Sequence, residues 1–180
     1  FRSNNLEQFG RGCSSACTAG AIKLTRMMGF RFVDNVVEDT LGSEGNGFWC
    51  DINCKDAVIT GNLVRNNGRA GIFYEISSRG IIAGNLAVGN GDSGILVGSA
   101  TTKVYNNTVV VDPTEPLGEG ISVYDDSRWP GNPAETGPNT SGIEVVNNVL
   151  VSSSGRLLAT AEGDGPNNSM PMPARSGGVW

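Results

Sequence analysis

The chain has 180 residues, which is enough to bury one hydrophobic core, and its formal net charge is −5 with no basic run. This charge pattern excludes nucleic acid as a partner. Histidine is absent, so any catalysis must use carboxylates, lysine, arginine or tyrosine. Apolar runs stay far below the ~20 residues of a membrane span, so no membrane partner is expected.

A repeated unit runs along the chain. It consists of a glycine that opens a short apolar strand, a turn, a second apolar strand that ends at an asparagine, and a third short apolar strand. The units start at Gly20, Gly47, Gly71, Gly94 and Gly120, with spacings of 27, 24, 23 and 26 residues. Short strands at this period, without a helical segment, predict a solenoid whose neighbouring coils bury one another.

The asparagines that recur once per unit are Asn35, Asn62, Asn85, Asn107 and Asn148. An apolar residue lies three positions before each of them and another lies two positions after it. Asparagine tolerates the left-handed backbone of a sharp corner, and stacked amides can bond from coil to coil. We therefore expect a structural asparagine ladder, with no role in ligand binding.

The predicted fold is all-β: a right-handed parallel β-helix of about six coils, with three short strands per coil, over residues 1–162. The repeat is already under way at residue 1, so we expect a fragment of a longer β-helix. Residues 126–141 form an insertion in coil five, and residues 163–180 an extended tail. Uncapped coil ends could add strands from another chain, which makes self-association a further expectation.

One face of the first strands carries candidate chemistry. Alternation places Trp49 and Asp51 outward on one coil and Phe73 and Glu75 outward on the next. The two carboxylates should then lie about 4.8 Å apart, close enough to share a proton or a cation. Flat aromatic rings beside carboxylates suit a sugar ring, so the expected partner is a polysaccharide.

Two enzymatic roles remain open for this face. In a retaining glycoside hydrolase, Asp51 and Glu75 are the acid and the nucleophile or base. In a polysaccharide lyase, the pair holds Ca²⁺ or neutralises a uronate, and Lys23 or Arg79 takes the proton. The substrate-binding residues would be Trp49, Phe73, Tyr124 and Asp125, and Ca²⁺ at Asp51 and Glu75 is the one cofactor considered.

The alternative is a structural, adhesive or filament-forming surface solenoid. Its aromatic side chains would be covered by a loop such as the insertion, and its carboxylates would pair with Lys23, Arg69 or Arg79. The two functions predict different surfaces: Trp49 and Phe73 line an open groove in an enzyme and are buried in a structural solenoid.

The four cysteines are Cys13, Cys17, Cys50 and Cys54, in two pairs with three residues between partners. An even number in a chain rich in glycine and asparagine favours disulfides over a metal site, although the spacing leaves the pairing open. Disulfides indicate an oxidising compartment, and we expect a secreted or cell-surface protein.

The repeat resembles the pectin-lyase-like right-handed β-helix superfamily over residues 1–160. The segments 47–52, 71–77 and 124–128 are similar to a group of secreted bacterial β-helix proteins without an assigned activity. The resemblance implies the fold and polysaccharides as the substrate class. It implies no catalytic residue, because no established lyase or hydrolase motif matches residue by residue.

Overall fold

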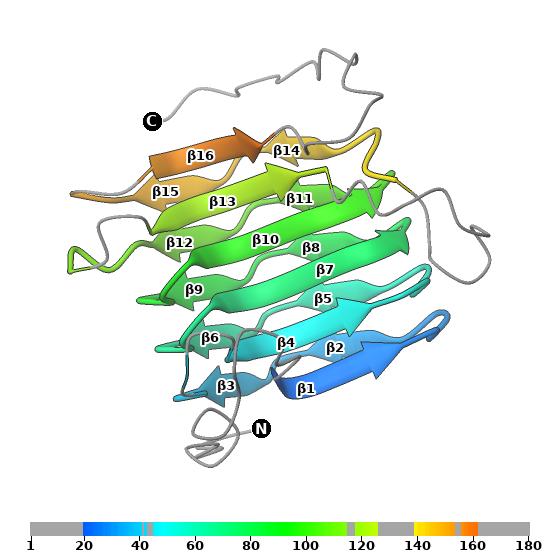
Figure 1. The fold of residues 1–180 in the computed structure, drawn as a ribbon, viewed down its shortest axis with the longest axis horizontal. Coiled ribbons are helices and arrows are strands. Elements are labelled where there is room, and N and C mark those ends of the chain that lie inside the picture. Colours follow the sequence, from blue (N-terminus) through cyan, green and yellow to red (C-terminus); the bar gives the residue numbers. More distant parts are fainter. Residues whose placement is uncertain are drawn as a thin grey trace.

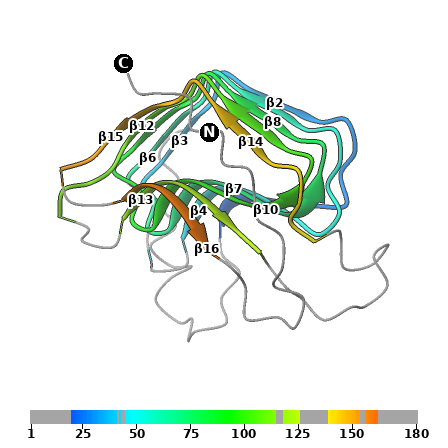
Figure 2. The same ribbon diagram turned by 90° about the horizontal axis from the view of Figure 1, so that it is seen from above.

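The computed structural model describes residues 20–40, 42, 45–114, 118–125, 139–153 and 156–161. Sixteen β-strands, and no helix, are found in these parts of the chain. The strands form three parallel sheets that run along the solenoid (Figure 1). Seen along the axis, two sheets meet at a ridge and the third lies opposite (Figure 2).

Each coil contributes one strand to each sheet, so strands that neighbour each other in a sheet are one coil apart in sequence. Sheet A consists of β1 (Gly20–Thr25), β4 (Asn46–Asp51), β7 (Ala70–Ser78), β10 (Ser93–Ala100), β13 (Glu119–Tyr124) and β16 (Arg156–Ala161). Sheet B consists of β2 (Arg31–Val33), β5 (Val58–Thr60), β8 (Ile81–Ala83), β11 (Lys103–Tyr105) and β14 (Glu144–Val146). Sheet C consists of β3 (Val36–Glu38), β6 (Leu63–Arg65), β9 (Leu86–Val88), β12 (Thr108–Val110) and β15 (Val149–Val151).

The predicted parallel β-helix is confirmed. The described residues make five complete coils and the sheet A strand of another, against an expectation of about six. The expected first coil falls on residues 1–19, and most of the insertion and all of the tail fall on residues 126–138 and 163–180. These segments, and with them the predicted domain boundaries, lie outside the described residues.

The core is built of apolar columns that run from coil to coil. In sheet A, one inward column joins Ile22, Phe48, Ile72, Ile95 and Ile121, in register from strand to strand. Sheets B and C add the apolar residues that flank the asparagines, among them Ile59, Ile82, Val64 and Val109, all fully buried. Because parallel strands are buried on their inner side along the whole stack, each coil covers its neighbours.

The asparagine ladder lies at the ridge between sheets B and C. The Nδ2 atoms of Asn35, Asn62, Asn85 and Asn107 donate to the Oδ1 atom of the next asparagine at 3.1, 2.9, 2.9 and 2.9 Å, ending at Asn148. Each amide also donates to a main-chain carbonyl of the preceding coil or its own, as Asn85 does to Ile59 at 2.9 Å. The ladder therefore ties neighbouring coils together through buried polar groups.

At this corner, the residue with a left-handed backbone is the one before the ladder asparagine. The expectation from the sequence, which placed the left-handed backbone at the asparagine itself, is therefore wrong. Positive φ angles between 54° and 68° occur at Asp34, Gly61, Gly84, Asn106 and Asn147, and not at the ladder residues. The ladder side chain must point inward from an extended backbone, so the turn falls on the residue before it. Glycine, asparagine and aspartate tolerate that turn best.

The first coil is offset by one residue from the predicted unit. Gly20 pairs with Asn46 and not with Gly47. From Gly47 onward the glycine is required, because a Cβ atom there would lie 2.5 Å from the carbonyl oxygen of Gly71. No such contact is found at Gly20, where the closest atom would be at 3.4 Å.

Candidate functional site

The outer face of sheet A carries one column of register partners: Lys23 on β1, Trp49 on β4, Phe73 on β7, Leu96 on β10 and Ser122 on β13. Two positions further along the strands lie Asp51 and Glu75. The alternation read from the sequence thus brings the predicted lysine, aromatic rings and carboxylates onto one face, as the side-chain period of a strand requires.

Lys23 is the cation of this face. Its Nζ atom lies 2.7 Å from Asp51 Oδ2 and 3.5 Å from the centre of the Trp49 ring. The Lys23 side chain is 24% exposed, whereas that of Asp51 is 5% exposed. The other oxygen, Asp51 Oδ1, is buried without a hydrogen-bond partner. The ammonium therefore both neutralises the carboxylate and lies on an aromatic face.

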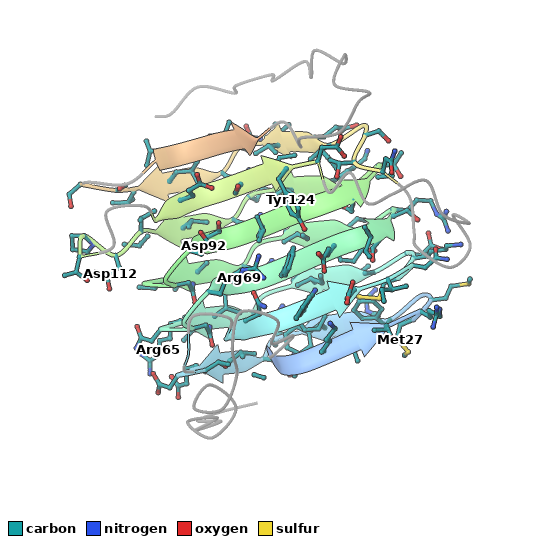
Figure 3. All side chains as sticks on the ribbon, viewed as in Figure 1. Met27, Arg65, Arg69, Asp92, Asp112 and Tyr124 are labelled. Atoms are coloured by element: carbon teal, nitrogen blue, oxygen red, sulfur yellow. A yellow bond between two sulfur atoms is a disulfide. The ribbon has the colours of Figure 1, made fainter. Side chains whose placement is uncertain are left out.

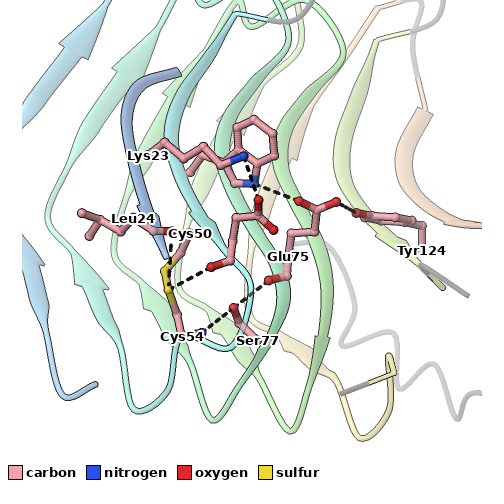
Figure 4. A network of polar contacts seen from close by, with 9 residues as sticks. Lys23, Leu24, Cys50, Cys54, Glu75, Ser77 and Tyr124 are labelled. Carbon is pink, nitrogen blue, oxygen red and sulfur yellow. Dashed lines mark hydrogen bonds and ion pairs between the residues drawn. A yellow bond between two sulfur atoms is a disulfide. The ribbon is translucent and has the colours of Figure 1, made fainter. Parts of the chain in front are cut away.

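Glu75 is held by two aromatic donors (Figure 4). Trp49 Nε1 donates to its Oε2 at 3.0 Å, and Tyr124 Oη donates to its Oε1 at 3.1 Å. Tyr124 lies two strands away, on β13, and reaches Glu75 across Gly98 of β10. A Cβ atom at Gly98 would lie 2.6 Å from the Tyr124 ring, so this contact depends on the glycine.

The aromatic side chains form a second, smaller hydrophobic cluster. Trp49 and Phe73 stack with ring centres 5.2 Å apart, and Tyr124 is tilted against Phe73 at 6.1 Å. The Arg69 guanidinium lies 5.1 Å from the centre of the Phe73 ring. Figure 3 shows Arg69, Asp92 and Tyr124 together on this side of the sheet. The stacked rings and the cation above them stabilise one another.

The face is closed. Trp49, Phe73, Asp51 and Glu75 are only 4%, 1%, 3% and 5% exposed. Within the part of the chain that the structure describes, Trp49 and Phe73 are therefore buried and line no open groove.

Arg79 does not join the two carboxylates. It lies in the turn after β7, where its Nε and Nη2 atoms bond Asp56 at 2.6 and 2.7 Å. This bidentate bond lowers the pKa of Asp56 and raises that of Arg79. Asp125 follows β13 and is half-buried, and its buried Oδ1 atom has no hydrogen-bond partner among the described residues. Because its guanidinium is bonded to Asp56, Arg79 is unsuited to take a proton beside Asp51 or Glu75.

The residues do not fit a Ca²⁺ site. Calcium takes six to eight oxygen ligands. Lys23 already occupies the cation position at Asp51, and both Glu75 oxygens accept hydrogen bonds. Within the described ranges, no three His, Cys, Asp or Glu side chains converge on one point.

The backbone directly after each carboxylate is unusual, in a turn after Asp51 and at a bulge inside β7 after Glu75. Ile52 and Ile76, which come directly after Asp51 and Glu75, have φ angles of 47° and 36°. A β-branched residue is rarely found there, and such positions cost of order 1–3 kcal/mol each. The packing of the surrounding coils holds these turns in place.

The first of these turns is closed by a disulfide between Cys50 and Cys54, one of the pairings left open by the sequence. In the next coil the equivalent turn is closed by Tyr74, whose hydroxyl donates to the Ser78 carbonyl at 2.9 Å. Burial raises the pKa of the Tyr74 hydroxyl. Cys13 and Cys17 lie outside the described residues.

Residues 3–109 match the family model described as the right handed beta helix region. The match covers more than half of the chain, and the chain belongs to this family. No curated protein and no solved structure matched the chain. A helix long and apolar enough to cross a membrane is not found in the part of the chain that the structure describes.

Proposed function

We propose that the chain is a non-catalytic, structural segment of a secreted or cell-surface β-helix. The outer face of sheet A acts as a stabilising cluster that fixes the coils relative to one another. The observation that carries this proposal is the burial of the two carboxylates and the two stacked rings, none of which is more than 5% exposed.

The polar contacts support the same role. A substrate-binding carboxylate needs a free oxygen that faces solvent, but Asp51 is bonded to Lys23 and Glu75 to Trp49 and Tyr124. These contacts join β1, β4, β7 and β13 and so link four coils. The buried Cys50–Cys54 disulfide supports an oxidising, extracellular location.

The test is the double variant Asp51→Asn/Glu75→Gln. We expect it to lose about 1–3 kcal/mol of unfolding free energy per site, because Lys23 loses its counter-ion and two aromatic donors lose a charged acceptor. Urea unfolding measures this loss. Wild type should leave acidic and neutral polysaccharides intact in an assay of released chain ends.

The matched control also removes two carboxylate charges, but from exposed ion pairs. Asp56→Asn/Glu144→Gln removes the partners of Arg79 and Lys103, which are exposed, and should leave the urea midpoint nearly unchanged. Cleavage of one polymer by wild type and not by a folded Asp51→Asn/Glu75→Gln variant would overturn the structural role.

A second candidate function is binding of an acidic polysaccharide at Lys23. The observation that favours it is the 24% exposure of the Lys23 side chain, whose ammonium lies on the Trp49 ring. A partly exposed ammonium complements the carboxylate of a uronate. If this polymer is also cleaved, Asp51 and Glu75 are the groups to act.

Calorimetric titration with uronate oligosaccharides tests this candidate. Saturable binding by wild type that Lys23→Met weakens tenfold or more would support it. An equal affinity of both proteins, or no heat at millimolar oligosaccharide, would refute it.

A further inference from the structure

Lys23 and Asp51 place an amine and a carboxyl group in direct contact between two coils. The Lys23 Nζ atom on β1 lies 2.7 Å from the Asp51 Oδ2 atom on β4. The strands pair Lys23 with Trp49 and Thr25 with Asp51, so the contact runs diagonally over the Trp49 ring. The backbone of the solenoid thus holds together the two groups from which an amide bond is made, and such fixed contact accelerates reactions between neighbouring groups.

The surroundings of this contact solvate charge poorly. The Asp51 side chain is 5% exposed, and among the described residues its Oδ1 atom has no hydrogen-bond partner. The Trp49 ring centre lies 3.5 Å from Lys23 Nζ, and Phe73 stacks on the same ring at 5.2 Å. Taking two opposite charges out of water is unfavourable even when they pair. A reaction that removes both charges is therefore more favourable here than in water.

Glu75 is a second buried carboxyl group beside the first. Asp51 and Glu75 come directly after the register partners Cys50 and Tyr74, on neighbouring strands that lie about 4.8 Å apart. The Oε2 atom of Glu75 also accepts a hydrogen bond at 3.0 Å from Trp49 Nε1 (Figure 4). Because neighbouring carboxyl groups can share a proton, Glu75 is suitably placed to carry protons to and from the reacting pair.

We propose that Lys23 and Asp51 condense into an intramolecular amide bond, which cross-links β1 to β4. One ammonium proton passes by way of Glu75 to the Asp51 carboxylate, and this leaves an amine and a carboxylic acid. The amine nitrogen then attacks Asp51 Cγ, and the bond between Cγ and Oδ2 breaks. Two of the three ammonium protons leave with Oδ2 as water, and the third stays on the amide nitrogen. The reaction needs no oxidant, reductant or other reactant.

This inference rests on the proposed structural role and deepens it, because a covalent bond fixes two coils that the ion pair joins. The bond would also consume the ammonium that an acidic polysaccharide would need. Urea unfolding tests the structural role, whereas the mass of the chain tests the bond, so each can fail without the other.

The test is the intact mass of the full chain, folded, then reduced and measured under denaturing conditions. Wild type should be lighter than its sequence by the mass of one water molecule. Proteolysis should release a branched peptide that joins Lys23 to Asp51. This bond should survive mild base, which opens the cyclic imides through which aspartate also loses water. A full mass, or a lost water that maps to another site, would overturn the inference, and neither result depends on a variant.

Lys23→Arg is the matched control, because a guanidinium keeps the positive charge beside Asp51 and on the Trp49 ring but is a far weaker nucleophile. This variant should keep its full mass. Loss of water from it would contradict the assignment to Lys23.

Glu75→Gln tests the proton transfer. Chains purified unfolded are allowed to fold, and their mass is followed with time beside their circular dichroism. A variant that folds like wild type should condense about a hundredfold more slowly or not at all, because general acid–base catalysis is lost. Condensation at the rate of wild type would refute the role of Glu75.

Discussion

Asn85 is the central rung of the ladder. Its replacement by alanine should lower the free energy of unfolding more than most other substitutions of buried residues in the chain. Its Oδ1 atom accepts from the Asn62 main-chain N–H at 3.0 Å, and its Nδ2 atom donates to the Ile59 carbonyl at 2.9 Å. Asn85→Ala removes these two contacts, together with the side-chain bonds to Asn62, Ala83 and Asn107, in a site that is 2% exposed. The groups that lose a buried partner are the Asn62 main-chain N–H and the Ile59 carbonyl. Two buried groups lose a partner at about 1–3 kcal/mol each, or ~4 kcal/mol together.

Urea unfolding followed by circular dichroism measures this loss. With a slope of about 2 kcal/mol per molar urea, the midpoint should fall by about 2 M. The control is Asn35→Ala, at the first described rung, where the side chain donates to Asn62 and to Val33 and accepts from none of the described residues. That change orphans fewer buried groups and should cost about 1 kcal/mol. Equal losses for the two variants would refute the ladder as the source of the stability.

Three further changes probe the site. Gly98→Val should lower the free energy of unfolding by about 1–3 kcal/mol and alter the near-ultraviolet circular dichroism, because its Cβ would lie 2.6 Å from the Tyr124 ring; an unchanged spectrum would count against that contact. Cys50→Ala/Cys54→Ala opens a loop of sequence separation 4 and should cost about 2 kcal/mol, with wild type unaffected by mild reductant because both sulfurs are buried. The pKa of Asp56 lies below its ordinary value of 3.8, so its pairing contributes stability above that pH and loses it as pH falls through the lowered pKa. Arg79→Gln should return that pKa toward 3.8 in a carboxyl NMR titration, and an unchanged pKa would contradict the bidentate bond.

The fold was predictable because its determinants are local and repeated. The apolar residues before and after each asparagine identify the inward positions of sheets B and C, and alternation along β4 and β7 identifies Trp49 and Phe73 as register neighbours. Each rule needs only the side-chain period of a strand and a constant corner.

The structure contains a second asparagine ladder that we did not predict, although the sequence indicates it. Asn67 Nδ2 donates to Asn90 Oδ1 at 2.9 Å, and Asn67 Oδ1 accepts from the Thr40 main-chain N–H at 3.3 Å. Both asparagines follow a ladder asparagine by five residues and precede a glycine. That constant offset marks the corner between sheets C and A.

The closure of the face was not predictable from local patterns. Tyr124 reaches Glu75 across 49 residues of sequence, and its contact requires the glycine on the strand between them. The partner of Arg79 depends on which way a two-residue turn points its side chain. Exposure and pairing of this kind are set by the stacking of distant coils, which periodicity does not encode.

The ladder contact between Asn107 and Asn148 spans 41 residues, yet its length of 2.9 Å equals that of the contact between Asn85 and Asn107, which spans 22. The insertion between the sheet A strand β13 and the sheet B strand β14 therefore leaves the ladder contact between Asn107 and Asn148 unchanged. The entropy of closing a loop grows only with the logarithm of its length, by about 0.6 kcal/mol for each doubling. The corner after β13 is thus the natural place to graft a foreign peptide into this protein without altering the scaffold that displays it.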